Sequence, residues 1–340
     1  MKKIKTTDPQ YIKINKFIKV PMPIAIALGL LLLGTSFYSG YAWNKLKNTD
    51  TSTKANSSTI AFEVQKSQKP ELKFFVMSFC PYGNQMEDLL RPVFDLLKDK
   101  ADITPHYIFN KIDNLDTYCK ASDGSSQCQA YVDDIVKSGN TNAPFKDVAG
   151  CKKYFNDLTK ECLDTNNYVK NSNGTMYSSL HGRQEANQDV REICAWNQAT
   201  DKTQWWNFIA NVNKNCTAQN ADTCWENQAK SAGYDTAKIT ECFNKEGIDL
   251  IEKEFALTTK FNVSGSPTVL VNDVAFPPET AYTQDGKGSL KIGTKVATQD
   301  RYRTPNVIKE AICASFQKSP SECKTELPDL TGQAVPAGGC

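Results

Sequence analysis

The stretch Phe74-Phe75-Val76-Met77-Ser78-Phe79-Cys80-Pro81-Tyr82-Gly83-Asn84-Gln85-Met86-Glu87 runs from an apolar, strand-like segment into a helical pattern, with one cysteine at the change. Pro81 suits the first turn of a helix, because the N–H that proline lacks has no partner there. The pattern therefore predicts that Cys80 lies over free backbone N–H groups and the positive end of a helix dipole, which favour a thiolate over a thiol. Apolar residues continue the helical spacing along one face: Leu89, Leu90, Val93, Phe94 and Leu97.

A second segment, far along the chain, has the features of a partner for the first. Ser266-Pro267 stands immediately before the β-branched run 268–272. Together the two segments resemble the thioredoxin fold, in which a cis-proline loop packs beside the active-site cysteine. The resemblance implies that Cys80 is the catalytic nucleophile. It also implies that four residues bind the substrate chain: Pro81, Tyr82, Ser266 and Pro267.

Residues 180–194 carry a further motif, in which His181-Gly182 is followed by Glu185 and then by Cys194. This spacing resembles the signature of the gamma-interferon-inducible lysosomal thiol reductase family, and the similarity covers residues 71–272 loosely. The sequence departs from that signature at three positions. Ser179 and Ala186 stand where that family has cysteines, and Asp189 stands where it has an asparagine.

The resemblance implies an α/β fold, namely a thioredoxin fold interrupted by a disulfide-rich α-helical insertion, as in Dsb-type oxidoreductases. Two roles are open for His181. It can act as a base or a cation near the Cys80 thiolate, where an imidazolium would lower the pKa of the thiol. Alternatively, it is a histidine near the start of a helix.

The cysteine content indicates an oxidising compartment. The chain has 12 cysteines but only 2 histidines, and no C-x-x-C pair occurs. Structural disulfides are therefore favoured over zinc, which is the alternative. We expect neither a metal nor a cofactor. The 40 basic and 38 acidic residues nearly balance, so the sequence does not predict a nucleic-acid partner.

Sequence proximity suggests a disulfide pairing, although sequence does not fix connectivity. Four close pairs each close a loop of about ten residues: Cys119/Cys128, Cys151/Cys162, Cys216/Cys224 and Cys313/Cys323. Cys194 and Cys242 are then left for each other, and Cys80 and Cys340 remain. The Gly-Gly-Cys segment that ends at Cys340 can supply a resolving thiol for Cys80, form an intermolecular disulfide, or stay free.

The amino-terminal region has the pattern of a membrane anchor. Lysines dominate residues 1–20, and an uncharged stretch follows from Val20 to Trp43. Such a stretch is long enough to cross a bilayer, which takes about 20 residues. A retained signal-anchor is favoured, with a cleaved signal peptide as the alternative, because Gly40 and Ala42 together form a small-residue cleavage site. The prediction is a single-pass membrane protein with a cytoplasmic N-terminus and an extracytoplasmic folded domain.

The expected domain order follows from these assignments. It comprises a basic segment (1–20), a transmembrane anchor (21–43), a linker (44–70), the first half of the thioredoxin fold (71–110), a cysteine-rich helical insertion (111–245), the second half of the fold (246–316) and a tail (317–340).

These features predict a membrane-anchored protein that exchanges disulfides with exported cysteine-containing proteins through Cys80 in a C-P-Y-G motif. Gly83 stands where a dithiol enzyme of this fold carries its second cysteine. Release of a substrate then needs a substrate thiol, a small thiol such as glutathione, or Cys340, which favours monothiol or isomerase-like behaviour. A membrane protein or a small thiol is the expected redox partner. The alternatives are a redox-inactive thioredoxin-like chaperone or adaptor, and a structural role at the cell surface.

Overall fold

The computed structural model describes residues 59–121, 123–139, 143–164, 168–277, 289–298, 304–328 and 340. The chain divides into two compact units, of which the larger comprises Thr53–Tyr118 and Asp164–Cys340. The described part of the smaller unit is Cys119–Leu163. The predicted basic segment and membrane anchor lie outside the described residues, and so does most of the linker. Within the described ranges, no helix combines the length and the apolar character needed to cross a membrane.

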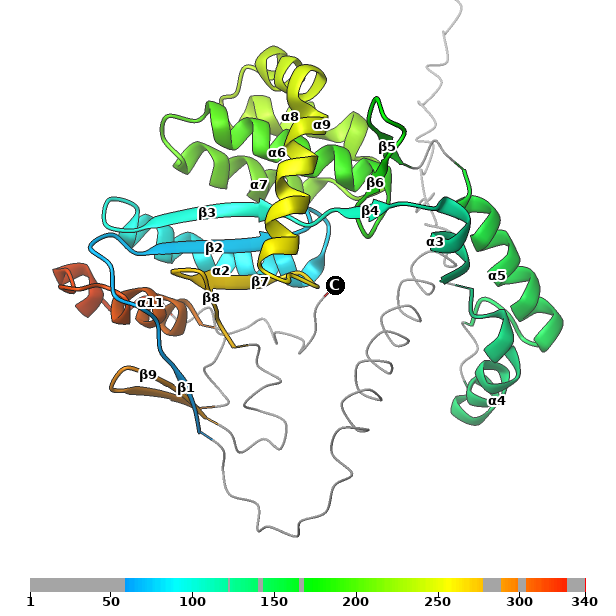
Figure 1. Ribbon diagram of the computed structural model, residues 1–340, viewed down its shortest axis with the longest axis horizontal. Helices are drawn as coiled ribbons and strands as arrows, with labels where there is room; N and C mark the ends of the chain where they lie inside the picture. Colours follow the sequence, from blue (N-terminus) through cyan, green and yellow to red (C-terminus); the bar gives the residue numbers. More distant parts are fainter. Residues whose placement is uncertain are drawn as a thin grey trace, which may run out of the picture. The chain divides into compact units, whose positions relative to one another are not determined.

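The larger unit is organised around a four-stranded sheet with the order β3-β2-β7-β8 (Figure 1). Strand β2 (Glu71–Val76) lies parallel to β3 (Asp102–Tyr107) and antiparallel to β7 (Thr268–Val271), which pairs with the short β8 (Val274–Ala275). Helix α2 (Pro81–Leu97) connects the two parallel strands. This βαβ unit followed by an antiparallel pair is the thioredoxin-like arrangement that the sequence predicted.

The two faces of β2 bury side chains in two different clusters, because successive residues of a strand point to opposite sides. Leu72, Phe74 and Val76 belong to the main core, together with the apolar face of α2. Phe75 points the other way, into a separate cluster that contains Cys80. The strand therefore supports the core on one side and the cysteine on the other.

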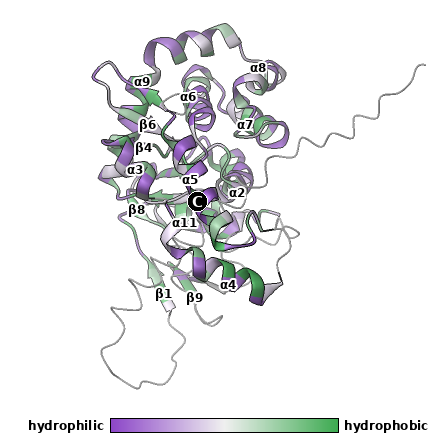
Figure 2. Cartoon of the chain, turned by 90° about the vertical axis from the view of Figure 1, so that its right-hand side faces the viewer, coloured by the Kyte–Doolittle hydropathy of each residue, from purple (hydrophilic) through white to green (hydrophobic). Residues whose placement is uncertain are grey.

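A helical insertion separates β3 from β7, as predicted. It contains α6 (Arg183–Gln198), α7 (Thr203–Asn215), α8 (Ala221–Ser231) and the long α9 (Thr236–Lys260), whose end leads into β7 (Figure 1). Helix α6 is unusual, because it is buried along most of its length although its residues are largely hydrophilic (Figure 2).

Two small sheets and a closing helix complete the larger unit. Strands β4 (Asn110–Ile112), β6 (Met176–Ser178) and β5 (Val169–Lys170) form one sheet, and β1 (Thr59–Phe62), β9 (Ser289–Ile292) and β10 (Lys295–Thr298) form the other. The closing helix is α11 (Pro305–Ala314), followed by a short 3₁₀ turn at Ser321–Lys324.

The smaller unit is a helical hairpin with its own core. Helix α3 (Leu115–Ala121) leads into it, and a 3₁₀ turn at Ser125–Gln127 precedes α4 (Cys128–Ser138) and α5 (Val148–Cys162). Phe145, Tyr154 and Phe155 form the buried cluster between these elements. The disulfides Cys119–Cys162 and Cys128–Cys151 close the hairpin at two levels.

This connectivity shows that two of the expected pairings, Cys119/Cys128 and Cys151/Cys162, are wrong. Cys151 and Cys162 lie on the same helix, α5. At about 1.5 Å per residue the helix holds them ~16 Å apart, whereas a disulfide needs Cα atoms within about 7 Å. The bonds therefore form across the hairpin.

The other three expected pairings are confirmed: Cys194–Cys242, Cys216–Cys224 and Cys313–Cys323. With the sixth bond, Cys80–Cys340, all twelve cysteines are paired. Six disulfides in one chain are typical of proteins of the secretory pathway or other oxidising compartments.

Candidate active site

Cys80 lies where β2 and its following turn meet helix α2. It is the N-cap residue, with Pro81 in the first turn, and its side chain is fully buried. The backbone N–H of Gly83 donates to Cys80 Sγ at 3.4 Å. A thiolate at this sulfur would therefore gain both a direct N–H donor and the favourable end of the α2 dipole.

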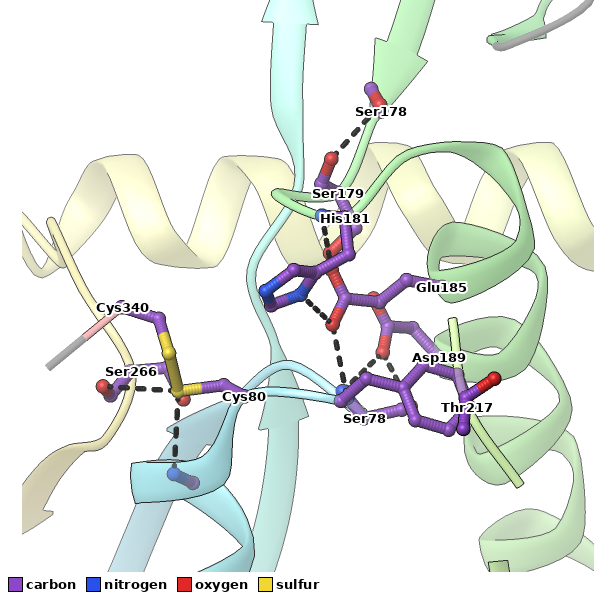
Figure 3. Close-up of polar contacts among 12 residues, drawn as sticks. Ser78, Cys80, Ser178, Ser179, His181, Glu185, Asp189, Thr217, Ser266 and Cys340 are labelled. Carbon is purple, nitrogen blue, oxygen red and sulfur yellow. Dashed lines mark hydrogen bonds and ion pairs between the residues drawn. A yellow bond between two sulfur atoms is a disulfide. The ribbon is translucent and has the colours of Figure 1, made fainter. Parts of the chain in front are cut away.

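Cys80 is bonded to Cys340, which is 260 residues away in the sequence (Figure 3). The backbone of Cys340 also pairs with Ser266. Cys340 N donates to Ser266 O at 2.9 Å, and Ser266 N donates to Cys340 O at 2.9 Å. This reciprocal pair is the one that two antiparallel strands make. Cys340 is thus held both through its sulfur and through its backbone.

The Ser266-Pro267 loop is built for this close approach. Its peptide bond is cis, and Ser266 is buried. A Cβ on Gly265 would lie 2.7 Å from the Cys340 carbonyl oxygen, so the glycine leaves the space that the paired residue occupies. The sequence predicted the loop, but it did not reveal which chain segment lies against it.

Gly83 packs against the same loop. A Cβ at this position would lie 2.7 Å from Ser266 Oγ, which is closer than real Cβ contacts allow. A second cysteine in the C-P-Y-G motif would therefore have to displace a buried serine. The position that holds the second cysteine of a dithiol motif is therefore blocked here. Cys80 is bonded instead to Cys340, which is distant in the sequence.

An apolar surface surrounds the disulfide. The partly buried members of the cluster that contains Cys80 and Cys340 come from α2, α9 and the loops before α6 and β7: Tyr82, Leu180, Leu257, Phe261 and Val263. Of the other residues predicted to bind substrate, Pro81 is exposed and Pro267 half-buried. The rim of the site thus consists largely of apolar side chains.

Two carboxylates of α6 hold the turn before Cys80 (Figure 3). Asp189 Oδ1 accepts from Ser78 N at 2.9 Å and from Ser78 Oγ at 2.6 Å. Glu185 Oε1 accepts from Phe79 N at 3.0 Å. Both carboxylates have no exposed surface. The helical insertion therefore contacts the candidate active site directly.

His181 pairs with Glu185. Its Nδ1 lies 2.7 Å from Glu185 Oε1, and its backbone N–H donates to Glu185 Oε2 at 2.7 Å. Burial lowers the pKa of His181, but the hydrogen bond and the charge of Glu185 outweigh burial, and the pKa is raised above 6.5. The structure therefore places His181 just before α6, as an ion-pair partner of the carboxylate that holds the Phe79 amide.

Two further acids are buried beside these residues. Tyr107 donates to Glu192 Oε2 at 2.7 Å, and Asn213 Nδ2 donates to Glu87 Oε2 at 2.7 Å. Burial raises the pKa of Glu192 to about 7, and burial together with the charge of Glu192 raises the pKa of Glu87 well above 4.5. Burial and the charge of Glu185 likewise raise the pKa of Asp189. Burial therefore favours the protonated forms of these acids.

Ser78 and Asp189 are the site residues that sequence reasoning missed. Asp189 counted only as a departure from a family signature, and Ser78 only as part of a strand. One signal was present: Glu185, Asp189 and Glu192 repeat at a spacing that places three acids on one helix face. Because an exposed acidic face has the same spacing, the pattern alone does not reveal that this face is buried.

Part of the chain matches a known protein family. Residues 137–281 match the family model of the vacuolar sorting receptor thioredoxin-like domain. Among solved structures, the chain is similar to the "Crystal structure of a putative protein disulfide isomerase from Nitrosomonas europaea", with 12% sequence identity and a TM-score of 0.33. That match covers 64% of this chain and 95% of the other. No curated protein matches the sequence. The chain thus contains a thioredoxin-like domain with a helical insertion.

Proposed function

We propose that this protein exchanges disulfides with exported cysteine-containing proteins through a reversible disulfide between Cys80 and Cys340. One observation carries the proposal. The cysteine at the start of α2 is bonded to a residue that is also paired, through its backbone, with the loop at Ser266. Cys340 thus occupies the position that a substrate cysteine would need in order to react with Cys80.

The exchange balances as a two-electron reaction. In one direction, a substrate thiolate attacks Cys80 Sγ, the Cys80–Cys340 bond breaks, and Cys340 leaves as a thiolate that takes up a proton. A second substrate thiolate then attacks the substrate sulfur of the mixed disulfide, and Cys80 is released. The substrate is oxidised to a disulfide, and the protein is reduced to two thiols.

The reverse direction uses the same groups. The Cys80 thiolate attacks a substrate disulfide, and Cys340 then attacks Cys80 Sγ and releases the substrate as a dithiol. The Gly83 N–H and the α2 dipole make Cys80 both a good nucleophile and a good leaving group. The relative reduction potentials of protein and substrate set the direction. Cys340 therefore supplies the resolving thiol that Gly83 does not, and the protein acts as a dithiol rather than a monothiol.

Substrate binding follows from the same geometry. We assign the backbone of Ser266 to pairing with an extended substrate chain, as it pairs with Cys340. Pro81, Tyr82 and Pro267 would then lie along that chain, and the apolar rim suits partly unfolded polypeptides. In this proposal residues 21–43 anchor the protein in a membrane, with the folded part on the extracytoplasmic side and a membrane protein or small thiol as redox partner.

The test is a trapping experiment with the full-length chain and a peptide that contains one disulfide. After mild reduction of Cys80–Cys340 and acid quenching, mass spectrometry measures the Cys80–peptide mixed disulfide. We expect Cys340→Ser to accumulate at least tenfold more of it than the wild type, because nothing resolves the bond. Cys80→Ser should form none. A Cys313→Ser/Cys323→Ser variant, which loses a different disulfide, is the matched control and should behave like the wild type.

Two results would contradict the proposal. One is release of the peptide by Cys340→Ser at the wild-type rate. The other is peptide binding by Cys80→Ser at wild-type affinity with no mixed disulfide in any variant. The second result would favour the redox-inactive chaperone or adaptor, which uses the apolar rim without covalent chemistry.

A further inference from the structure

The amides of Ser78 and Phe79 both donate to carboxylates of the inserted helix α6. Asp189 accepts from Ser78 N at 2.9 Å, and Glu185 accepts from Phe79 N at 3.0 Å. The two acceptors are one helical turn apart, and the two donors are consecutive in the chain immediately before Cys80. Two neighbouring N–H groups are thus fixed by two buried carboxyl groups from a segment more than 100 residues away.

Packing alone does not explain these residue types. Glu185 and Asp189 are fully buried, and burying a carboxylate is costly unless hydrogen bonds compensate for lost hydration. An apolar side chain of similar volume would fill the same space without that cost. The compensation comes from the Ser78–Phe79 turn and from His181, so the carboxylates and the turn depend on each other.

The Ser78–Phe79 turn also fixes the position of Cys80. Cys80 N donates to Met77 O at 3.0 Å, which closes the same turn, and Cys80 Sγ accepts from Gly83 N at 3.4 Å. A shift of Ser78 or Phe79 therefore moves the sulfur relative to the start of α2. The 3.4 Å separation is an ordinary N–H···S distance, and a shift of the sulfur away from α2 would lengthen and weaken this contact.

We propose that Glu185 and Asp189 are positioning residues, which hold the Ser78–Phe79 turn and thereby set the reactivity of Cys80. The inference rests on the proposed function of Cys80. It assigns a role to the His181-Gly182 motif as well, since His181 contacts Glu185 through both its ring Nδ1 and its backbone N–H. The insertion then contributes to the chemistry of the site.

The groups that face Asp189 make this reactivity dependent on pH. On α6 these are Glu185 and Glu192, and on β3 Tyr107, while Ser78 supplies the hydrogen bonds. Asp189 Oδ2 has no hydrogen-bond partner among the described residues, which leaves room for a proton. A protonated Asp189 is a weaker acceptor for the Ser78 amide than a charged one. We therefore expect the reactivity of Cys80 to respond to a second titration besides that of its own thiol.

The experiment measures the alkylation rate of Cys80 from pH 4 to pH 9 in the full-length Cys340→Ser protein, in which Cys80 is the unpaired thiol. In this background the rate should rise in two steps. Asp189→Asn keeps an acceptor oxygen but does not titrate, so its profile should show one step. Asp189→Ala should slow alkylation at least tenfold, and Asp189→Asn should recover part of that loss. Glu185→Gln should shift the apparent pKa of Cys80 as well.

The controls separate a local effect from a general loss of structure. Asp222→Asn makes the same chemical change at an α8 residue that contacts α6 through Arg191 and Asn187, and it should keep the two-step profile. Ser78→Ala removes the hydroxyl donor from the other side and should weaken the second step without changing any carboxylate.

Two patterns overturn the positioning role: a two-step profile in Asp189→Asn, or an equal change in Asp222→Asn. Because a small alkylating reagent needs no substrate site, this readout is independent of peptide trapping. An altered alkylation profile together with failed trapping would overturn the proposed function and retain the positioning role. Normal trapping with unaltered alkylation profiles would retain the proposed function and overturn the positioning role.

Discussion

At the scale of single residues, Gly83 explains why the active-site motif has one cysteine. Its hydrogen atom faces Ser266 Oγ, and a Cβ there would lie 2.7 Å from that oxygen. The glycine therefore lets the start of α2 and the cis-proline loop pack together. Its N–H is the donor to Cys80 Sγ, so the same residue fixes the sulfur and closes the usual resolving position.

Gly83→Ala should lower the free energy of unfolding by about 1–3 kcal/mol, because the added methyl group overpacks a buried contact. Ser266→Ala removes the colliding oxygen, so the double variant should lose less than the sum of the two single variants, with a coupling of about 1 kcal/mol. Chemical denaturation of the four proteins measures this cycle. Additive losses would show that Ser266 is not the contact that excludes a side chain at position 83.

At the scale of elements, α6 combines a hydrophilic sequence with a buried position. Its acids accept hydrogen bonds from the turn before Cys80 and from β3, and the disulfide Cys194–Cys242 fixes it to α9. One interpretation of the sequence places His181 near the start of a helix, and the family resemblance singles out Glu185. Periodicity does not distinguish a solvated acidic face from a buried one, however, because both have the same spacing. Only the contacts with β3 and the turn decide it.

The raised pKa of the buried acid Glu192 predicts how the free energy of unfolding depends on pH. Its pKa is raised from 4.5 to about 7 in the folded protein, mainly by burial, so the folded state binds more protons than the unfolded state between these values. The free energy of unfolding should therefore fall as pH rises from about 4.5 through about 7, by at most ~3 kcal/mol from this group. Glu192→Gln should reduce that fall.

Denaturation curves at several pH values test this prediction. The control is Glu226→Gln on α8, an exposed acid paired with Lys230, which should leave the pH dependence almost unchanged. Some slope should persist in Glu192→Gln, because Glu87 and Asp189 also have raised pKa values. An unchanged slope in Glu192→Gln would mean that Glu192 does not change protonation on folding.

At the scale of the whole molecule, the six disulfides divide into two kinds. Five join segments within the helical regions or next to α11, and they serve to stabilise the fold. The sixth, Cys80–Cys340, links the start of α2 to the last residue of the sequence. Among the described contacts, this is the one disulfide in which a sulfur accepts a hydrogen bond from the N-terminus of a helix.

Graded reduction should therefore open Cys80–Cys340 first. The stabilised Cys80 thiolate is the best leaving group of the six bonds, and Cys340 is partly exposed to an attacking thiol. Differential alkylation with mass spectrometry, at rising concentrations of dithiothreitol, gives the order. We expect at least a tenfold lower midpoint for this bond than for Cys194–Cys242. Earlier opening of any of the other five bonds would contradict the assignment of Cys80–Cys340 as the redox-active pair.

The sequence by itself determined the local parts of this protein. The strand, turn and helix around Cys80, the Ser266-Pro267 loop and the short disulfides such as Cys216–Cys224 depend on neighbouring residues, whose patterns are legible in the chain. Elimination among the cysteines left Cys340 as a candidate partner of Cys80, and the tertiary structure chose this bond over an intermolecular disulfide or a free thiol. The tertiary structure alone decided the crossed bonds of the smaller unit and the burial of Asp189. These features join segments tens to hundreds of residues apart, and periodicity and spacing carry no information about which distant segments meet.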